Sequence, residues 1–328
     1  MVALMCFFSS LCIVLLLSPA VIPHLRRLKL GQRVRDDGPA SHKSKEGTPT
    51  MGGVIIMAAV LPTALLFGRL AATERWRPGR IELLLPLVLV CTGYAIIGFA
   101  DDFLKVVKRR SLGLRARHKL LWQVVLAALL TAAVQRLDLG THVIVPYVLS
   151  SFDLGNLGYS LLGCLVVVGC ANAVNLTDGL DGLAAGTCAI AFGVYWLISV
   201  AAGRNELAVV SAAFAGACLG FLRYNFHPAK VFMGDTGSLA LGSALGGLAL
   251  LTKTELVLPV IGGVFVIETV SVILQVLSFR LTGRRVFRMS PLHHHFELCG
   301  VPERRVVVGF YALGVLFAVA GLLGLTGV

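Results

Sequence analysis

The sequence predicts an all-α, polytopic integral membrane protein with about ten transmembrane helices, and two observations carry that prediction: its composition and its long apolar runs. Of 328 residues, 57% are hydrophobic and only 14% are charged, and the mean hydropathy is +0.85. An average soluble protein has about 25% charged residues. This chain therefore lacks the polar surface that would cover a water-soluble globule.

The apolar runs have the length of membrane-spanning helices. A helix needs about 20 mostly apolar residues to cross the hydrocarbon core of a bilayer, which is about 30 Å thick. Ten segments meet this requirement or come close to it: 2–23, 51–67, 81–100, 120–135, 159–174, 184–202, 206–222, 239–251, 256–279 and 306–328. The first has a basic cluster after its Leu-rich centre and none before it, which is typical of a retained helix. We expect a single polytopic transmembrane domain over residues 1–328.

Positive charge is concentrated on one side of the predicted bundle. Of the 29 lysines and arginines, 22 lie in one alternating set of loops: 24–50, 101–119, 175–183, 223–238 and 280–305. Because Lys and Arg are enriched in cytoplasmic loops, this set is predicted to be cytoplasmic and both chain termini extracytoplasmic. The net charge of +12 then reflects orientation in the membrane, and no nucleic-acid partner is expected. Seven of the eight histidines lie on the same side, which indicates a second role for this face.

Two adjacent acids end the third predicted helix. Asp101 and Asp102 offer the oxygen ligands that Mg²⁺ prefers, and Lys105 lies four residues beyond Asp101 on the same helical face. The alternative is a solvated helix end with a local ion pair. Taken alone, an acidic pair favours that alternative.

A more specific pattern occupies residues 172–182. Asn172, Asn175, Asp178 and Asp181 recur every three residues, which keeps them near one face if the segment is helical. Gly179 allows a ligand or another backbone to approach closely. An Asp-Gly turn with an Asn cap is the weaker alternative.

Asp235 lies between two glycines and just before a predicted span. It suits a metal-binding carboxylate beside a phosphate-binding nest, and equally the cap of the next helix. Lys45 and Thr50, in a glycine-rich segment before the second span, suit phosphate contact or a helix-capping turn. Lys119 is either a helix-end lysine that reaches the membrane surface or a phosphate partner.

Histidines 293–295 form an unusual run near the C-terminus. Three consecutive side chains cannot all point one way, so a zinc site formed by them alone is not expected. Hydrogen bonds to phosphate oxygens fit better, with a solvated loop as the alternative. Glu268 lies mid-span, where an isolated acid is costly, and we expect it in an interhelical network. Gln275, nearer the cytoplasm, suits contact with a ligand.

Together these clusters supply what phosphoryl transfer requires: acids for Mg²⁺, cations for phosphate oxygens, and glycine turns for close approach. The motifs, in order, are GTPTMGG at 47–53, DDFLK at 101–105, NAVNLTDGLDG at 172–182, MGDTGS at 233–238, ETVSVILQV at 268–276 and PLHHHFE at 291–297. This set resembles the phospho-N-acetylmuramoyl-pentapeptide transferase family of the polyprenyl-phosphate N-acetylhexosamine-1-phosphate transferase superfamily. The resemblance covers nearly the whole chain.

The resemblance implies a function and a location. The expected reaction is Mg²⁺-dependent transfer of phospho-N-acetylmuramoyl-pentapeptide from UDP-N-acetylmuramoyl-pentapeptide to undecaprenyl phosphate, giving lipid I and UMP in peptidoglycan biosynthesis. The protein would be a multi-pass protein of the bacterial inner membrane, among membrane lipids, often a homodimer and a target of nucleoside antibiotics. A kinked ninth helix would border a groove for the prenyl chain, although Pro259 lies too near the outer end to be the obvious kink.

The resemblance also implies roles for individual residues. Asp235 would bind Mg²⁺ with Asp101 and Asp102 close by. The implied catalytic residues are Asp101, Asp102, Asp235, His293 and Lys119. The implied substrate-binding residues are Lys45, Thr50, Asn172, Asn175, Asp178, Gly179, Asp181, Asn225, Phe232, Gln275, His294 and His295.

Alternatives remain at this stage. Within the superfamily, the alternative is a transferase that uses UDP-N-acetylglucosamine as its donor. The histidine run favours the branch that uses the muramoyl-pentapeptide donor. From another class, an ion-coupled transporter would explain Glu268 but not the gathering of acids and histidines at the cytoplasmic helix ends. Direct attack by the lipid phosphate is favoured over a phospho-enzyme, because a phosphate monoester with a second pKa of about 6 is largely dianionic at neutral pH.

Overall fold

The computed structural model describes residues 1–27, 45, 47–72, 81–107, 113–137, 139–148 and 150–325. Its helices are α1 (Val2–Arg27), α2 (Gly53–Ala72), α3 (Ile81–Val107), α4 (Ala116–Arg136), α5 (Gly155–Thr177), α6 (Leu183–Ala201), α7 (Asn205–Asn225), α8 (Gly234–Thr252), α9 (Leu258–Ile261), α10 (Gly263–Thr282), α11 (Leu292–Leu298) and α12 (Glu303–Leu323). Two short strands, β1 (His142–Val145) and β2 (Ser150–Asp153), complete the described elements. The predicted all-α membrane fold is thus largely confirmed.

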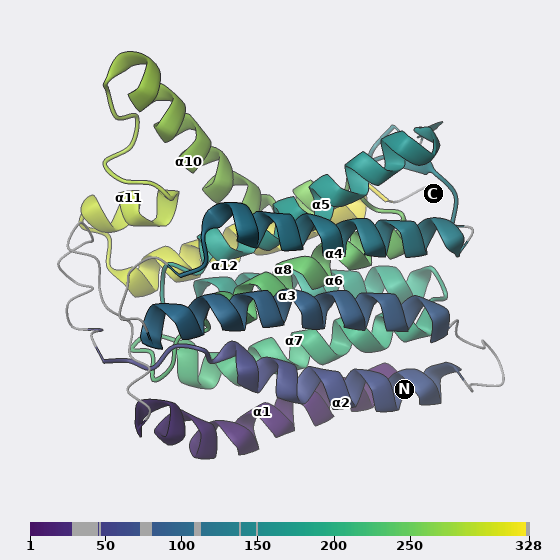
Figure 1. Ribbon diagram of the computed structural model, residues 1–328, viewed down its shortest axis with the longest axis horizontal. Helices are drawn as coiled ribbons and strands as arrows, with labels where there is room; N and C mark the ends of the chain where they lie inside the picture. Colours follow the sequence, from purple (N-terminus) through teal and green to yellow (C-terminus); the bar gives the residue numbers. More distant parts are fainter. Residues whose placement is uncertain are drawn as a thin grey trace.

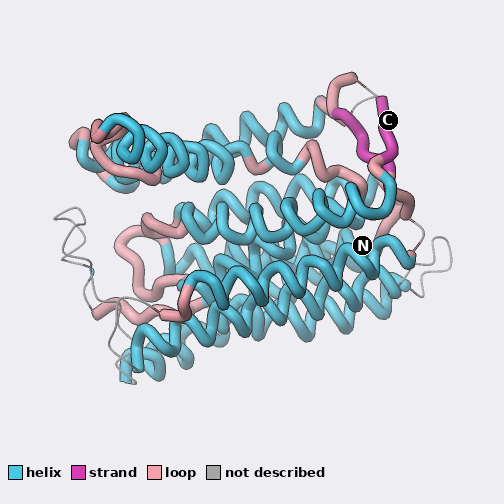
Figure 2. Tube along the Cα trace, turned by 45° about the horizontal axis from the view of Figure 1, so that its top comes forward, coloured by secondary structure: helices cyan, strands magenta, loops and turns pink. Residues whose placement is uncertain are grey.

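Most of the long helices run side by side in one bundle (Figure 1). The N-terminus and the C-terminal end of the chain lie at the same end of this bundle, and α11 lies at the other (Figure 1). The antiparallel hairpin β1–β2 lies at the end with the termini (Figure 2). We did not predict this hairpin, because its strands have only four residues each.

Nine helices in the described part of the chain are long and apolar enough to cross a membrane, and they match nine of the ten predicted segments. The tenth segment, 239–251, lies within α8, which is not among the nine. Every residue of α8 from Thr236 to Thr252 is buried. The helix packs mainly against α3 and α5. Because its surroundings are protein rather than lipid, glycines and serines replace the large apolar side chains of a lipid-facing span.

The predicted ninth span, 256–279, is broken into α9 and α10 at Gly262. Pro259 lies in the short α9 and does not cause the break. Beyond Gly262, α10 diverges from the bundle and projects from it (Figure 1). Val270, Ile273 and Leu277 are exposed along α10, so the helix presents an apolar surface outside the protein core.

Close packing between α3 and α8 fixes the end of the bundle that carries the conspicuous acids. A Cβ atom added at Gly98 in α3 would lie 2.1 Å from the carbonyl oxygen of Asp235 in α8. A Cβ at Gly53, in the first turn of α2, would lie 2.1 Å from the backbone nitrogen of Gly237. No side chain fits at either position, so three helices meet backbone to backbone beside Asp235.

Gly98→Ala is therefore expected to destabilise the protein, by about 1–3 kcal/mol as in other overpacked cores. Thermal unfolding in detergent measures the effect. Gly193→Ala in α6 is the matched control, because no atom lies within 4 Å of the added Cβ there. The control is expected to unfold at or slightly above the wild-type temperature. Equal stability of the two variants would contradict the close approach of α3 and α8.

Candidate functional site

Three carboxylates meet where α3 ends and α8 begins. Asp101 and Asp102 lie in the last two turns of α3, and Asp235 lies in the first turn of α8. One carboxylate oxygen from each lies within 4.8 Å of the other two. The structure thus brings together acids that are separated by more than a hundred residues in the chain.

Asp102 caps the N-terminus of α8 from a different helix. Its oxygens accept hydrogen bonds from the backbone N–H groups of Asp235 (3.1 Å) and Thr236 (3.0 Å) and from the Thr236 hydroxyl (2.7 Å). The first backbone N–H groups of a helix have no partner within the helix, and the helix dipole is positive there, so a carboxylate is stabilising. Asp102 therefore has a structural role whatever else it does.

Two lysines form ion pairs with the carboxylates of Asp235 and Asp101. Lys119 Nζ lies 2.5 Å from Asp235 Oδ2, and Lys105 Nζ lies 3.2 Å from the same oxygen and 2.6 Å from Asp101 Oδ2. Asp101 Oδ1 also accepts a hydrogen bond from the backbone N–H of Leu114 at 2.8 Å. Of the two interpretations of Lys119, the structure supports a role in the site. Lys105 joins the same site, although the sequence suggested only its pairing with Asp101.

The donor set fits a hard divalent cation. The three acids carry three negative charges against two from the lysines, and all their donor atoms are oxygens. Mg²⁺ is commonly held by one or two carboxylates together with substrate phosphates and water. Asp101, Asp102 and Asp235 are thus the residues that would hold Mg²⁺ here.

The segment 172–182 divides between a helix and a turn. Asn172 and Asn175 lie in α5, but the helix ends at Thr177, so Asp178 and Asp181 do not continue the helical face. Asn175 donates to Asp235 Oδ1 (3.0 Å) and to the Ser238 hydroxyl (2.8 Å). Asn172 instead donates to Gln123 Oε1 in α4 at 2.8 Å. The structure therefore places Asn175, but not Asn172, in contact with the acidic site.

Asp178 faces the same site from the end of α5. Burial and the nearby negative charges of Asp235, Asp102 and Asp181 raise its pKa well above the ordinary value, against a lowering effect of the Gly234 backbone N–H. A carboxyl group held among like charges favours its protonated form or a neighbouring cation. The acidic surroundings of Asp178 agree with the excess negative charge of the site.

The histidine run forms the short helix α11, and its side chains point to different partners, as predicted. His293 is completely buried; its Nδ1 lies 3.1 Å from Glu268 Oε2 in α10, and its Nε2 lies against Gly179. His294 Nδ1 lies 2.9 Å from Glu297, and His295 Nδ1 accepts a hydrogen bond from the Arg288 backbone at 3.1 Å. The expected interhelical contact of Glu268 is confirmed.

Two further residues implied as substrate-binding hold loop backbone, and neither has a described contact with the three carboxylates. Asn225 accepts a hydrogen bond from the Gly182 N–H (3.1 Å) and donates to the Val231 carbonyl (2.9 Å). Gln275 donates to the Phe287 carbonyl and accepts from the N–H groups of Val286 and Phe287. The structure therefore shows both amides fixing loop conformation, at 182 and 231 for Asn225 and at 286–287 for Gln275.

The segment before α2 is joined to the segment before α8. Gly52 and Gly53 donate to the carbonyls of Phe232 and Met233, at 2.8 and 2.9 Å. Thr50 is buried beside Gly234, where an added Cβ would lie 2.8 Å from the Thr50 hydroxyl. These bonds place Thr50 and Phe232 beside the start of α8, which carries Asp235.

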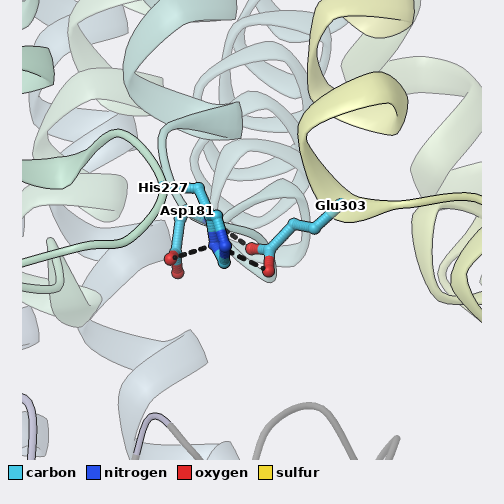
Figure 3. Close-up of side chains that lie close together, drawn as sticks. All are labelled: Asp181, His227 and Glu303. Carbon is cyan, nitrogen blue, oxygen red and sulfur yellow. Dashed lines mark hydrogen bonds and ion pairs between the residues drawn. The ribbon is translucent and has the colours of Figure 1, made fainter.

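A second charged cluster involves Lys45, Asp181, His227 and Glu303 (Figure 3 shows the last three). Burial alone would lower the pKa of Lys45, but the charges of Asp181 and Glu303 outweigh it and raise that pKa. Sequence reasoning missed His227 and Glu303. The first precedes a proline and the second begins a helix, so neither position suggested a site.

Comparison with known proteins supplies the identity of the chain. The model of the family "Glycosyl transferase family 4" matches residues 84–253, and "Phospho-N-acetylmuramoyl-pentapeptide-transferase signature 1" matches residues 45–57. The phospho-N-acetylmuramoyl-pentapeptide-transferase of Geobacillus sp. (strain WCH70) is 52% identical, over 98% of this chain and 97% of the relative. The chain belongs to the phospho-N-acetylmuramoyl-pentapeptide-transferase family.

Other members of the family agree. The proteins of the same name from Shouchella clausii and Bacillus subtilis (strain 168) are 53% and 52% identical, over 94% of this chain in each case and over 92% and 93% of the relatives. The chain is therefore an enzyme, a transferase of this family. The matched regions include Lys45 and Thr50 in the signature and the three carboxylates in the family model.

Because Asp102 caps α8 and Asp101 does not, replacing each by alanine should change the stability of the protein by different amounts. Asp102→Ala removes three hydrogen bonds at the N-terminus of α8, whereas Asp101→Ala removes one backbone hydrogen bond and one ion pair. We expect Asp102→Ala to be the less stable variant by about 1 kcal/mol. Chemical or thermal unfolding of the two purified variants tests this, and equal stability would contradict the capping role.

Proposed function

We propose that this enzyme transfers phospho-N-acetylmuramoyl-pentapeptide from UDP-N-acetylmuramoyl-pentapeptide to undecaprenyl phosphate, releasing UMP and forming lipid I for peptidoglycan biosynthesis. The observation that carries the proposal is the meeting of Asp101, Asp102 and Asp235 with Lys105 and Lys119 at one end of a bundle of membrane-type helices. Such a site suits a water-soluble diphosphate donor and an acceptor that reaches it from the lipid.

The acidic cluster is proposed to hold Mg²⁺, which would neutralise charge on the diphosphate. Lys105 and Lys119 form ion pairs with Asp235. When the donor binds, these two ammonium groups would also contact its phosphate oxygens. Asn175 keeps the Asp235 carboxylate oriented through its hydrogen bond to Oδ1. The protein then contributes positioning and charge rather than covalent chemistry.

We propose direct transfer. An oxygen of the lipid phosphate attacks the phosphorus linked to the sugar, one P–O bond forms, the bond to UMP breaks, and UMP leaves with the electron pair. At neutral pH the lipid phosphate, with a second pKa of about 6, is largely dianionic and needs little help from a base. Asp101 is held by Lys105 and the Leu114 N–H, which supports a positioning role over attack by this carboxylate.

The proposed topology has ten crossings, with α8 as the one shielded from lipid. An even number of crossings agrees with chain ends on the same side of the bundle (Figure 2). The excess of Lys and Arg in the opposite loops supports a cytoplasmic site and extracytoplasmic termini, in the bacterial inner membrane. The exposed apolar face of α10 offers the prenyl chain a surface. A homodimer and nucleoside-inhibitor binding, both implied by the resemblance, stay predictions.

Asp235→Asn is expected to lower turnover at least about 100-fold, because the isosteric amide removes the charge that binds the cation and both lysines. The measurement is transfer of radiolabel from UDP-N-acetylmuramoyl-pentapeptide to undecaprenyl phosphate, with and without Mg²⁺. Chelation of Mg²⁺ should have a similar effect on wild type. Asp153→Asn, in the hairpin at the opposite end of the bundle, is the matched control and should remain active.

Near-normal turnover of Asp235→Asn would remove Asp235 from the proposed cation site. The same assay with UDP-N-acetylglucosamine as donor decides between the two candidate nucleotide sugars. We expect transfer from the muramoyl-pentapeptide donor only. Release of UMP that does not depend on polyprenyl phosphate would contradict the proposed reaction as a whole.

A further inference from the structure

The charged cluster of Lys45, Asp181, His227 and Glu303 joins four segments that are distant in the chain. Lys45 Nζ lies 2.8 Å from Asp181 Oδ1 and 2.6 Å from Glu303 Oε1. His227 Nδ1 lies 3.0 Å from Asp181 Oδ2 and 3.1 Å from Glu303 Oε2. Figure 3 shows the His227 ring between the two carboxylates. Each of the two carboxylates therefore contacts the Lys45 ammonium through one oxygen and the His227 imidazole through the other.

This cluster already contains its own cation. Donor atoms of Asp181, His227 and Glu303 lie within 4.8 Å of one another, a spacing that would also suit a metal ion. The Lys45 ammonium, however, contacts an oxygen of each carboxylate and balances their charge. The arrangement is therefore an ion-pair network whose geometry fixes protein segments relative to one another.

Asp181 faces the protein rather than open solvent. Besides Lys45 at Oδ1, its Oδ2 accepts a hydrogen bond from the Ala229 N–H at 3.0 Å and contacts His227. Its exposed fraction is 3%. Because its acceptor sites are largely used by these three donors, Asp181 acts chiefly by holding Lys45 and the 227–229 segment.

Glu303 contacts all three other members of the cluster. Its Oε1 accepts from Lys45 and, at 2.8 Å, from the backbone N–H of Asp181, while Oε2 faces His227. The Lys45 and Glu303 side chains are 12% and 8% exposed. Breaking a buried ion pair leaves an uncompensated charge and costs far more than breaking a surface pair.

The turn that Glu303 holds carries substrate-site residues. Asp181 lies three residues after Asp178, which faces Asp235 and Asp102, and two after Gly179, which packs against His293. Glu303 itself begins α12, four residues after the Cys299 that follows α11. A displacement of Glu303 would therefore move Lys45 and the 178–182 turn together.

We propose that Glu303 is a positioning residue for nucleotide-sugar binding: with His227 as its partner, it fixes Lys45 and the 178–182 turn. The inference rests on the proposed function, because it assigns these two residues to the donor side of that reaction. Glu303 acts through Lys45 and the turn and need not touch the substrate. It should therefore affect binding of the nucleotide sugar more than binding of the lipid or the transfer step.

Steady-state kinetics of Glu303→Gln test the proposal. The amide keeps an acceptor for the Asp181 N–H but loses the charge that holds Lys45. We expect KM for UDP-N-acetylmuramoyl-pentapeptide to rise about tenfold, while KM for undecaprenyl phosphate and kcat stay within about twofold. Glu303→Asp, which keeps the charge, should recover part of the loss. Glu82→Gln, an exposed acid at the far end of α3, is the matched control and should behave as wild type.

A double-mutant cycle distinguishes action through Lys45 from a general loss of structure. Lys45→Met alone should raise the same KM, and adding Glu303→Gln should raise it little further, because the coupled residues act as one unit. Additive effects, or an unchanged KM in Glu303→Gln, would overturn the inference. If Glu303→Gln does not fold, His227→Gln serves in its place and should raise the same KM by a smaller factor. Wild type that releases no UMP would instead refute the proposed function.

Discussion

The approach of the C-terminal end of α3 to the N-terminus of α8 is the contact on which the site depends. Gly98 allows the two backbones to touch, and Asp102 then supplies the acceptors that the first turn of α8 lacks. This pairing offsets part of the repulsion between neighbouring carboxylates, because one of them faces the positive end of a helix dipole. The remaining charge is shared with Lys105 and Lys119. The acids proposed to bind the cation thus also stabilise the contact between the two helices.

Around this contact, the chain assembles its loops by a few polar bonds. Gly52 and Gly53 join the segment before α2 to the segment before α8, Asn175 reaches Asp235 from α5, and the Glu268–His293 contact holds α11 against the turn after α5. Each bond joins segments far apart in sequence. The helices set the framework, and these backbone and side-chain contacts fix the segments that connect them at one end of it.

The sequence was sufficient for the framework, because long apolar runs are local patterns. The meeting of Asp235 with Asp101 and Asp102 was expected only through the family resemblance, because these acids lie far apart in the chain. The predicted segment 239–251 begins five residues after the observed start of α8 at Gly234. The glycines, threonine and serine of the first turn are residues typical of a loop. Sequence reasoning also missed His227 and Glu303. Glu303 lies 258 residues from its partner Lys45, and such a pairing follows from the packing of whole helices rather than from any spacing in the chain. The turn at Asp178 was obscured for a related reason, because its three-residue spacing imitates a helix.

The burial of α8 also bears on how the polypeptide is made. A segment passes from the translocon into lipid more readily when its own hydropathy is high. Among the long helices in the described part of the chain, α8 is the one that does not reach the hydropathy of a membrane span, and it has an acid in its first turn. Its main packing partners α3 and α5 are synthesised before it. The earlier helices are therefore available to pack around α8 as it is inserted, and Asp235 reaches the membrane after Asp101 and Asp102, the two acids that it joins.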